Sequence, residues 1–137
     1  MAPMQSSKTD LDLLQTLADD AGTAILPHFR ALPGVENKAS DRFDPVTVAD
    51  RAAEKAIRER LATIRPDDGV LGEEFPPTLG TSGRTWILDP IDGTRGFMSG
   101  LPTWGVLIAL ADGDGPFMGM MAQPFVGERF YASPDGV

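Results

Sequence analysis

Apolar residues recur every three or four positions in two stretches near the start of the chain. The first stretch covers residues 10–32, and the second begins near Thr47. Because this spacing places the apolar side chains on one face of a helix, we predict two amphipathic helices. Thr9 is expected to cap the first helix. Pro27 lacks a backbone donor, so this helix should kink near residues 23–24 or end early.

The second predicted helix has two distinct faces. Residues 47–50 have the form of a capping box, with Asp50 in place of the usual Glu. Glu54 and Arg58 are predicted to pair at i,i+4 spacing on the face opposite the apolar stripe. The turn residues at 66–69 should end the helix. The apolar stripe consists of Ala53, Ala56, Ile57, Leu61 and Ile64.

After the second helix, the pattern changes to short apolar runs that are typical of strands. Residues 106–110 form a nearly continuous apolar run, which indicates a strand buried on both faces. The Asp-Gly-Asp-Gly sequence at 112–115 predicts a hairpin turn between this strand and an antiparallel partner. We expect strands at residues 70–71, 84–88, 106–110, 117–122 and 129–132.

These elements predict an α+β fold. Two N-terminal helices would pack on one face of an antiparallel or mixed sheet, and the other face would stay uncovered. An uncovered apolar face indicates a missing second layer or a partner chain. The length of 137 residues is typical of one domain, so we treat residues 1–137 as a single unit.

Composition and charge exclude several classes of function. The chain has 12 Lys and Arg against 20 Asp and Glu, a net charge of −8, which argues against a nucleic-acid partner. It has no Cys, which excludes disulfides and thiolate-held zinc, and His28 is its single histidine. No apolar run reaches the ~20 residues of a membrane span, and no secretory signal is visible. We therefore expect a cytoplasmic protein.

Carboxylates gather where the predicted elements begin or end. In the most informative segment, residues 86–94, a buried strand leads directly to Asp89. Asp92 would face the same point as Asp89, and Gly93 and Thr94 could present consecutive N–H groups to an anion. Similar positions at the ends of other elements are occupied by Asp44, Asp50, Glu73 and Glu74.

Converging carboxylates need a compensating charge. Two of them held ~4 Å apart at an effective dielectric of ~20 repel by roughly 4 kcal/mol. A shared proton or a cation would offset this repulsion. Oxygen donors without His or Cys favour Mg²⁺, with Mn²⁺ or Ca²⁺ as substitutes. A cation beside N–H donors is the arrangement that a phosphoryl group requires.

Each acidic segment also has an ordinary structural explanation. Asp50 could merely complement a helix N-terminus, residues 73–74 could form a solvated turn, and Thr94 could be a turn hydroxyl. Their joint occurrence favours a functional site. Competing motifs fail, because Pro90 occupies the nucleophile position of a dehalogenase-type Asp-x-Asp-Gly-Thr, and the chain has no Gly-x-Ser-x-Gly or Walker motif.

Three motifs together resemble the signatures of the inositol monophosphatase superfamily in order and spacing. They are Asp44-Pro45-Val46-Thr47-Val48-Ala49-Asp50, Gly72-Glu73-Glu74-Phe75 and residues 86–94. Residues 94–105 are more similar to the histidinol-phosphatase branch than to the inositol branch, which typically has Thr-Thr-Asn-Phe after the glycine. The resemblance implies the fold of the N-terminal half of the family's αβαβα sandwich.

The resemblance implies a Mg²⁺-dependent phosphate monoester hydrolase. Glu73, Asp89 and the Ile91 carbonyl would hold a first Mg²⁺, and Asp89 and Asp92 would share a second. The ester would be cleaved by direct in-line attack of an activated water, without a phosphoenzyme.

The remaining implied roles concern water and phosphate. Thr94 and Glu73 would orient and activate the attacking water, with Asp50 supporting Thr94. The amides of Gly93 and Thr94 would bind the phosphate. Lys38 falls where the family often has a metal-site lysine, and we give it no role.

The implied substrate is histidinol phosphate, from histidine biosynthesis. The alternatives are inositol 1-phosphate or another small sugar phosphate, and a non-catalytic fragment or binding module that keeps only a cation site. Family members continue into a second α/β domain that supplies a further Asp ligand and the residues that choose the leaving alcohol. This sequence contains neither, so the chain alone is expected to be weakly active, inactive or poorly folded. The expected partner is a small phosphorylated metabolite, and a homodimer is compatible with the resemblance.

Overall fold

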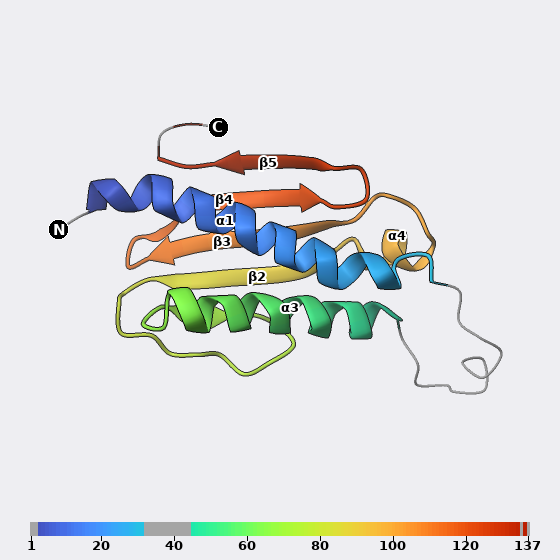
Figure 1. The fold of residues 1–137 in the computed structure, drawn as a ribbon, viewed down its shortest axis with the longest axis horizontal. Helices are drawn as coiled ribbons and strands as arrows, with labels where there is room; N and C mark the ends of the chain where they lie inside the picture. Colours follow the sequence, from blue (N-terminus) through green and yellow to red (C-terminus); the bar gives the residue numbers. More distant parts are fainter. Residues whose placement is uncertain (1–2, 32–44, 135, 137) are drawn as a thin grey trace.

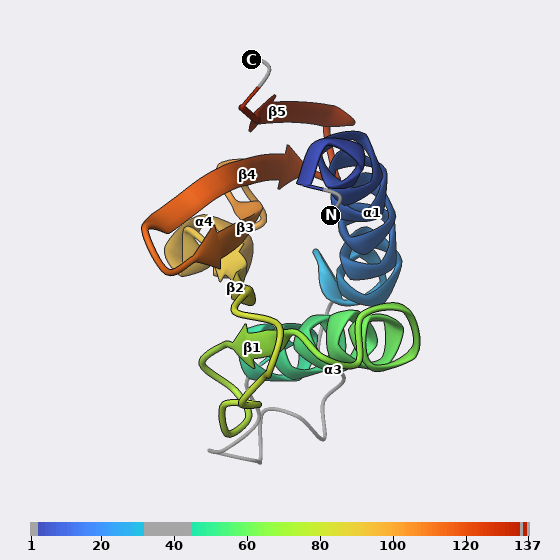
Figure 2. The same cartoon turned by 90° about the vertical axis from the view of Figure 1, so that its left-hand side faces the viewer.

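Two long helices lie on one face of a five-stranded sheet (Figure 1, Figure 2). The structure is a computed structural model that describes residues 3–31, 45–134 and 136. The strands are β1 (Gly69–Leu71), β2 (Thr85–Asp92), β3 (Gly105–Asp112), β4 (Gly115–Gln123) and β5 (Glu128–Ala132). They follow one another across the sheet in chain order. β1 and β2 run parallel and the other neighbouring pairs are antiparallel, which confirms the predicted α+β class and mixed sheet.

Both long helices begin at a proline, earlier than the sequence pattern predicted. α1 covers Pro3–Ile25 and α3 covers Pro45–Ile64. Proline is favoured at the first helical position because the N–H that it lacks would have no acceptor there. The predicted caps are therefore wrong, since Thr9 lies inside α1 and residues 47–50 lie inside α3.

Two short helical segments complete the described part of the chain. The 3-10 turn η1 (Leu26–His28) follows α1 directly and contains Pro27, so the first helix ends early rather than kinking. The predicted helical stretch ran on to Leu32, which lies outside the described residues. α4 (Thr94–Met98) follows β2. None of the described helices is long and apolar enough to cross a membrane.

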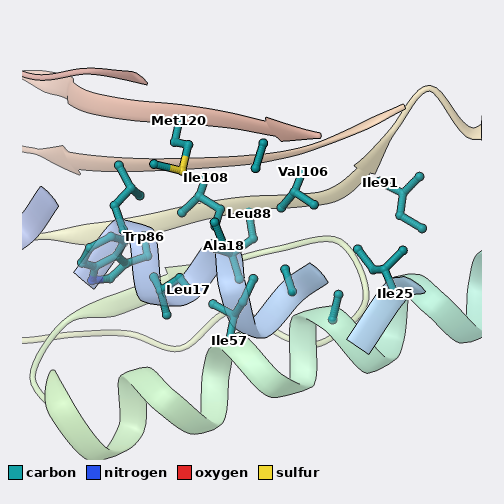
Figure 3. Packing of buried hydrophobic residues seen from close by; sticks show 14 of the residues in the cluster. Leu17, Ala18, Ile25, Ile57, Trp86, Leu88, Ile91, Val106, Ile108 and Met120 are labelled. Carbon is teal, nitrogen blue, oxygen red and sulfur yellow. The ribbon is translucent and has the colours of Figure 1, made fainter. Parts of the chain in front are cut away.

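The hydrophobic core lies between the two long helices and the sheet (Figure 3). Alternate residues of strands β2 and β3 are buried in it, such as Trp86 and Leu88 from β2 and Val106 and Ile108 from β3. Full burial of a side chain of this kind stabilises the fold by roughly 1.5–3 kcal/mol. The helices contribute Leu14, Leu17, Ala18, Ala21, Ile25, Ala53, Ile57 and Leu61.

The opposite face of the sheet has no long helix over it in the described part of the chain (Figure 2). Ile87, Leu107 and Ala109 are only half-buried on this face. The continuous apolar run had predicted that β3 is buried on both faces. This prediction is wrong, because one face of β3 is only half-buried. A hollow of about 540 Å³ lies here, with these apolar side chains in its lining together with Glu73 and Asp89.

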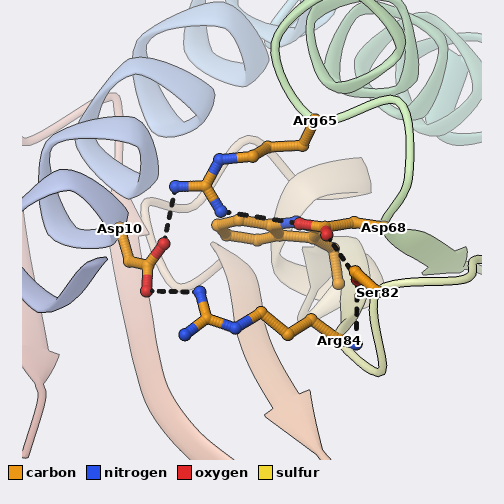
Figure 4. Close-up of polar contacts among 6 residues, drawn as sticks. Asp10, Arg65, Asp68, Ser82 and Arg84 are labelled. Atoms are coloured by element: carbon orange, nitrogen blue, oxygen red, sulfur yellow. Dashed lines mark hydrogen bonds and ion pairs between the residues drawn. The ribbon is translucent and has the colours of Figure 1, made fainter. Parts of the chain in front are cut away.

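A buried polar network ties α1 to the beginning of β2 (Figure 4). The carboxylate of Asp10 is fully buried and accepts hydrogen bonds from Arg65 at 2.6 Å and from Arg84 at 2.9 Å. Asp68 accepts a hydrogen bond of 2.9 Å from the indole Nε1 of Trp86. We call this network the arginine cluster; its members are Asp10, Arg65, Asp68, Ser82, Arg84 and Trp86.

Candidate metal and phosphate site

The end of β2 is irregular, and this irregularity affects the direction of its two last aspartates. Asp89 pairs with Leu107 and Asp92 pairs with Gly105, so three steps along β2 match two along β3. The extra residue makes a β-bulge, a feature that often re-aims side chains beside functional sites. The strand was predicted to end at Asp89, and it continues instead to Asp92.

A tight turn follows the bulge and leads into α4. Gly93 has a φ of 90°, which residues with a side chain rarely adopt. A Cβ at this position would lie 2.5 Å from the carbonyl oxygen of Thr103, so the turn needs a glycine. α4 begins directly afterwards at Thr94. The N–H groups in the first turn of a helix have no acceptor within the helix, and they can therefore bind another group.

Parallel pairing brings the turn after β1 beside the end of β2. Leu71 lies opposite Ile87, and two residues further along the chain from each of them Glu73 and Asp89 line the same hollow on the open face of the sheet. Asp50 comes from the second turn of α3, and α3 packs against β2. Three elements thus deliver carboxylates to one region of the molecule.

The pKa values show that these carboxylates act on one another. Burial and then the negative charges of neighbouring carboxylates raise the pKa of Asp50 from 3.8 to about 7. Burial is also the largest cause for Asp89, whose pKa rises from 3.8 to about 6 with the added charges of Glu73 and Asp92. The carboxylates that raise the pKa of Asp50 are Glu74, Asp89 and Glu73. We call Asp50, Glu73, Glu74, Asp89 and Asp92 the acidic site.

The chemistry of the acidic site suits a hard divalent cation. All of its side-chain donors are carboxylate oxygens, which Mg²⁺, Mn²⁺ and Ca²⁺ prefer. A cation between them would also relieve their mutual repulsion. As the side chains stand, no three acidic or histidine side chains within residues 3–31, 45–134 and 136 are arranged to hold one metal ion. Asp44 and Lys38 lie outside these residues.

A buried carboxylate that the sequence pattern did not predict, that of Glu54, lies next to this site. Glu54 does pair with Arg58 at 2.9 Å, but it is fully buried rather than on the solvent face. A signal was present in the sequence, because Glu54 precedes Ile57 by three positions and Leu61 by seven, the spacing of the apolar stripe. Its carboxylate lies against the turn at residues 72–75.

An α+β layer that brings carboxylates beside a Gly-Thr turn is suited to phosphate esters, which need a cation and N–H donors. The chain belongs to the inositol monophosphatase family, whose model matches residues 7–136. This is a family of phosphomonoesterases that act on small phosphorylated metabolites. Membership confirms the resemblance seen in the sequence.

Known relatives include curated histidinol-phosphatases and solved structures. The histidinol-phosphatase of Streptomyces coelicolor is 44% identical over 131 residues, which cover 92% of this chain and 48% of that protein. The histidinol-phosphatase of Mycobacterium tuberculosis is 43% identical over 127 residues, with 93% and 48% covered. An inositol monophosphatase from Zymomonas mobilis has a similar structure with a TM-score of 0.78 and 42% identity, covering 93% of this chain and 48% of that one. The chain therefore spans about half the length of the curated relatives it matches.

Proposed function

We propose that this chain forms the metal- and phosphate-binding domain of a Mg²⁺-dependent phosphate monoester hydrolase whose substrate is histidinol phosphate. The observation that carries the proposal is geometric: Glu73, after β1, and Asp89, near the end of β2, line one hollow, and β2 leads on to the glycine turn at Gly93. Family membership supports phosphomonoester hydrolysis. The identity to two histidinol-phosphatases supports the substrate.

The proposed metal ligands come from the turn after β1 and from the end of β2. Glu73, Asp89 and the Ile91 carbonyl would hold a first Mg²⁺, and Asp89 and Asp92 would share a second. The β-bulge supports this division, because residues three apart in a regular strand point to opposite faces and a bulge can turn them to one side. When bound, Mg²⁺ neutralises phosphate oxygens, lowers the pKa of water and stabilises the leaving alkoxide.

The attacking water would be held by Thr94 and Glu73. Glu73 is exposed, so its carboxylate can reach the water and take its proton while the new oxygen–phosphorus bond forms and the ester P–O bond breaks. The leaving alkoxide then takes up a proton from solvent. Asp50 is joined to β2 by a hydrogen bond with the Ile91 backbone, and from there it would support Thr94. The N–H groups of Gly93 and Thr94 would bind the phosphate.

Inositol 1-phosphate is the second candidate substrate. The similarity to the inositol monophosphatase from Zymomonas mobilis supports this candidate. At 42% identity, that protein is about as similar to this chain as the histidinol-phosphatases are. A third candidate is a domain that keeps the cation site without turnover, which the half-length match to the relatives favours.

Phosphate release from a panel of esters tests the proposal. With Mg²⁺, the purified chain is expected to release phosphate weakly, and faster from histidinol phosphate than from inositol 1-phosphate, and Asp89→Asn is expected to abolish the release. Asp12→Asn is the matched control, since Asp12 is an exposed aspartate of α1, and it should leave the rate unchanged. A preference for inositol 1-phosphate would overturn the proposal that histidinol phosphate is the substrate. Hydrolysis that survives Asp89→Asn would overturn the proposed role of Asp89 in the metal site. Binding of Mn²⁺ without hydrolysis would favour the third candidate, a domain that keeps the cation site without turnover.

A further inference from the structure

The turn that carries Glu73 is held by a buried carboxylate of α3. Glu54 is fully buried. Its Oε1 accepts the backbone N–H of Glu74 at 3.1 Å, and its Oε2 accepts the backbone N–H of Phe75 at 3.3 Å. One side chain thus fixes two consecutive peptide groups directly after Glu73.

Arg58 fixes the Glu54 carboxylate in turn. Its Nε donates to Oε2 of Glu54 at 2.9 Å, and its two terminal nitrogens donate to the Phe75 carbonyl at 3.3 Å and to the Thr78 hydroxyl at 3.1 Å. The guanidinium therefore neutralises the buried carboxylate and also contacts the loop that the carboxylate holds. A buried ionised carboxylate is tolerated when its charge and its lone pairs are satisfied in this way.

The residue before Glu73 has to be a glycine for this contact to form. A Cβ on Gly72 would lie 2.4 Å from Oε1 of Glu54. The Glu54 carboxylate consequently packs against Gly72, the residue before Glu73. It also accepts hydrogen bonds from the two residues after Glu73. Glu73 has little freedom to move its backbone while its side chain stays exposed.

We propose that Glu54 is a positioning residue, which holds the turn at residues 72–75 so that the Glu73 carboxylate faces Asp89. It acts through the peptide groups of Glu74 and Phe75 and does not itself ligate an ion. The inference rests on the proposed function, because it assumes that Glu73 and Asp89 share a cation.

Mn²⁺ binding to the full chain, followed by electron paramagnetic resonance, tests this inference. Glu54→Gln keeps the size of the side chain but replaces one acceptor oxygen by a donor, so the two N–H groups are no longer both satisfied. Loss of an outer partner of a metal ligand typically weakens metal affinity about 10- to 100-fold, and we expect a loss in this range. The matched control is Asp10→Asn. Asp10 is the other fully buried carboxylate that pairs with arginine, and its loss should leave Mn²⁺ affinity unchanged.

A second variant and a second measurement protect the test against poor folding. Gly72→Ala keeps Glu54 but places a Cβ 2.4 Å from its Oε1, so the carboxylate has to shift away from the turn and the loss of Mn²⁺ affinity should be reproduced. In the metal-free chain, amide hydrogen exchange by NMR should accelerate at Glu74 and Phe75 in Glu54→Gln and not in Asp10→Asn. This readout depends on the geometry of the turn and not on the metal.

The outcomes separate the inference from the proposed function. If the unsubstituted chain binds no Mn²⁺, the metal site fails, and the positioning role fails with it. If the chain binds Mn²⁺ but Glu54→Gln and Gly72→Ala leave the affinity within twofold, only the positioning role is overturned. It is also overturned if Asp10→Asn weakens binding as much as Glu54→Gln, because the effect would then follow from a general loss of stability.

Discussion

Strand β2 connects two groups of acidic residues, one whose charges are paired with arginines and one whose carboxylates lie near one another. At its beginning, in the arginine cluster, Asp10 is bound by two guanidinium groups at 2.6 and 2.9 Å. At its end, in the acidic site, burial and then the charges of neighbouring carboxylates raise the pKa of Asp50 to about 7 and that of Asp89 to about 6. At one end of β2 the negative charge of an aspartate is thus compensated by arginines. At the other end the aspartates lie among further carboxylates, which do not compensate their charge.

The difference separates a network that stabilises the fold from a group of carboxylates that does not. In the arginine cluster, every named carboxylate has an arginine or an N–H donor, so the network joins α1, the loop after α3 and β2 without residual repulsion. In the acidic site the repulsion remains in the fold. Clusters of groups with shifted pKa values that face one another are typical of functional sites.

The largest expected effect comes from breaking the arginine cluster. Arg65→Met removes a guanidinium that pairs with the buried Asp10 at 2.6 Å and with Asp68 at 3.5 Å, while Arg84 still pairs with Asp10. Leaving a buried charge without its partner is strongly destabilising, and we expect the free energy of unfolding in urea to fall by about 3 kcal/mol. Arg60→Met is the matched control, since Arg60 pairs with Asp20 at 2.8 Å on the surface. It should cost less than about 1 kcal/mol, and equal losses in the two variants would contradict the comparison.

The second effect is a pH dependence of the metal-free chain that has the opposite sign to ordinary acid denaturation. The pKa values of Asp50 and Asp89 are higher in the folded chain than their usual value of 3.8, so the folded state binds protons more tightly. The resulting stability is fully present below pH 3.8 and is lost as the pH rises through 6 and 7. Because both groups are partly exposed, we expect a discounted loss of about 2 kcal/mol between pH 5 and pH 8.

Urea unfolding at several pH values measures this dependence. The double variant Asp50→Asn, Asp89→Asn should flatten the profile, since it removes both titrating groups. A wild-type profile that rises from pH 5 to pH 8 would contradict the raised pKa values of Asp50 and Asp89.

The acidic site could be anticipated from the sequence, and the arginine cluster could not. The carboxylates of the acidic site stand next to local signals such as strand ends and the Gly-Thr turn, so their places in the elements can be read from short segments. Asp10 has no such signal, because its partners Arg65 and Arg84 lie 55 and 74 positions further along the chain. The sequence therefore placed Asp10 only at the start of a helix.

Two further differences have a local physical origin. The helix starts were missed because prolines at Pro3 and Pro45 begin both helices, while polar residues inside them imitate caps. The extent of β2 was missed because the bulge after Asp89 lets the strand continue past Pro90. In contrast, the two-layer α+β architecture followed directly from the apolar spacing, since that spacing fixes which face of each element is buried.

A smaller effect of opposite direction is expected from neutralising one member of the acidic site. Asp89→Asn removes a charge that is disfavoured by burial and repelled by Glu73 and Asp92, so the metal-free chain should become more stable at pH 8. Allowing for solvent screening of this partly exposed group, the gain in the free energy of unfolding is about 1 kcal/mol. Urea unfolding measures it, with Asp12→Asn as the exposed control. Destabilisation by Asp89→Asn would mean that this end of β2 is compensated like the other.

The smallest effect concerns the rim of the arginine cluster, where water can replace a lost partner. The Ser82 hydroxyl donates to Asp68 at 2.6 Å and accepts the backbone N–H of Arg84 at 3.1 Å. Ser82 is exposed, and Asp68 keeps its bond from Trp86, so Ser82→Ala should cost only about 0.5–1 kcal/mol in urea unfolding. It should leave Mn²⁺ affinity unchanged, because the substitution lies at the opposite end of β2 from the acidic site. A loss of 3 kcal/mol, as expected for Arg65→Met, would show instead that the whole cluster acts as one cooperative unit whose members cannot be replaced singly by solvent.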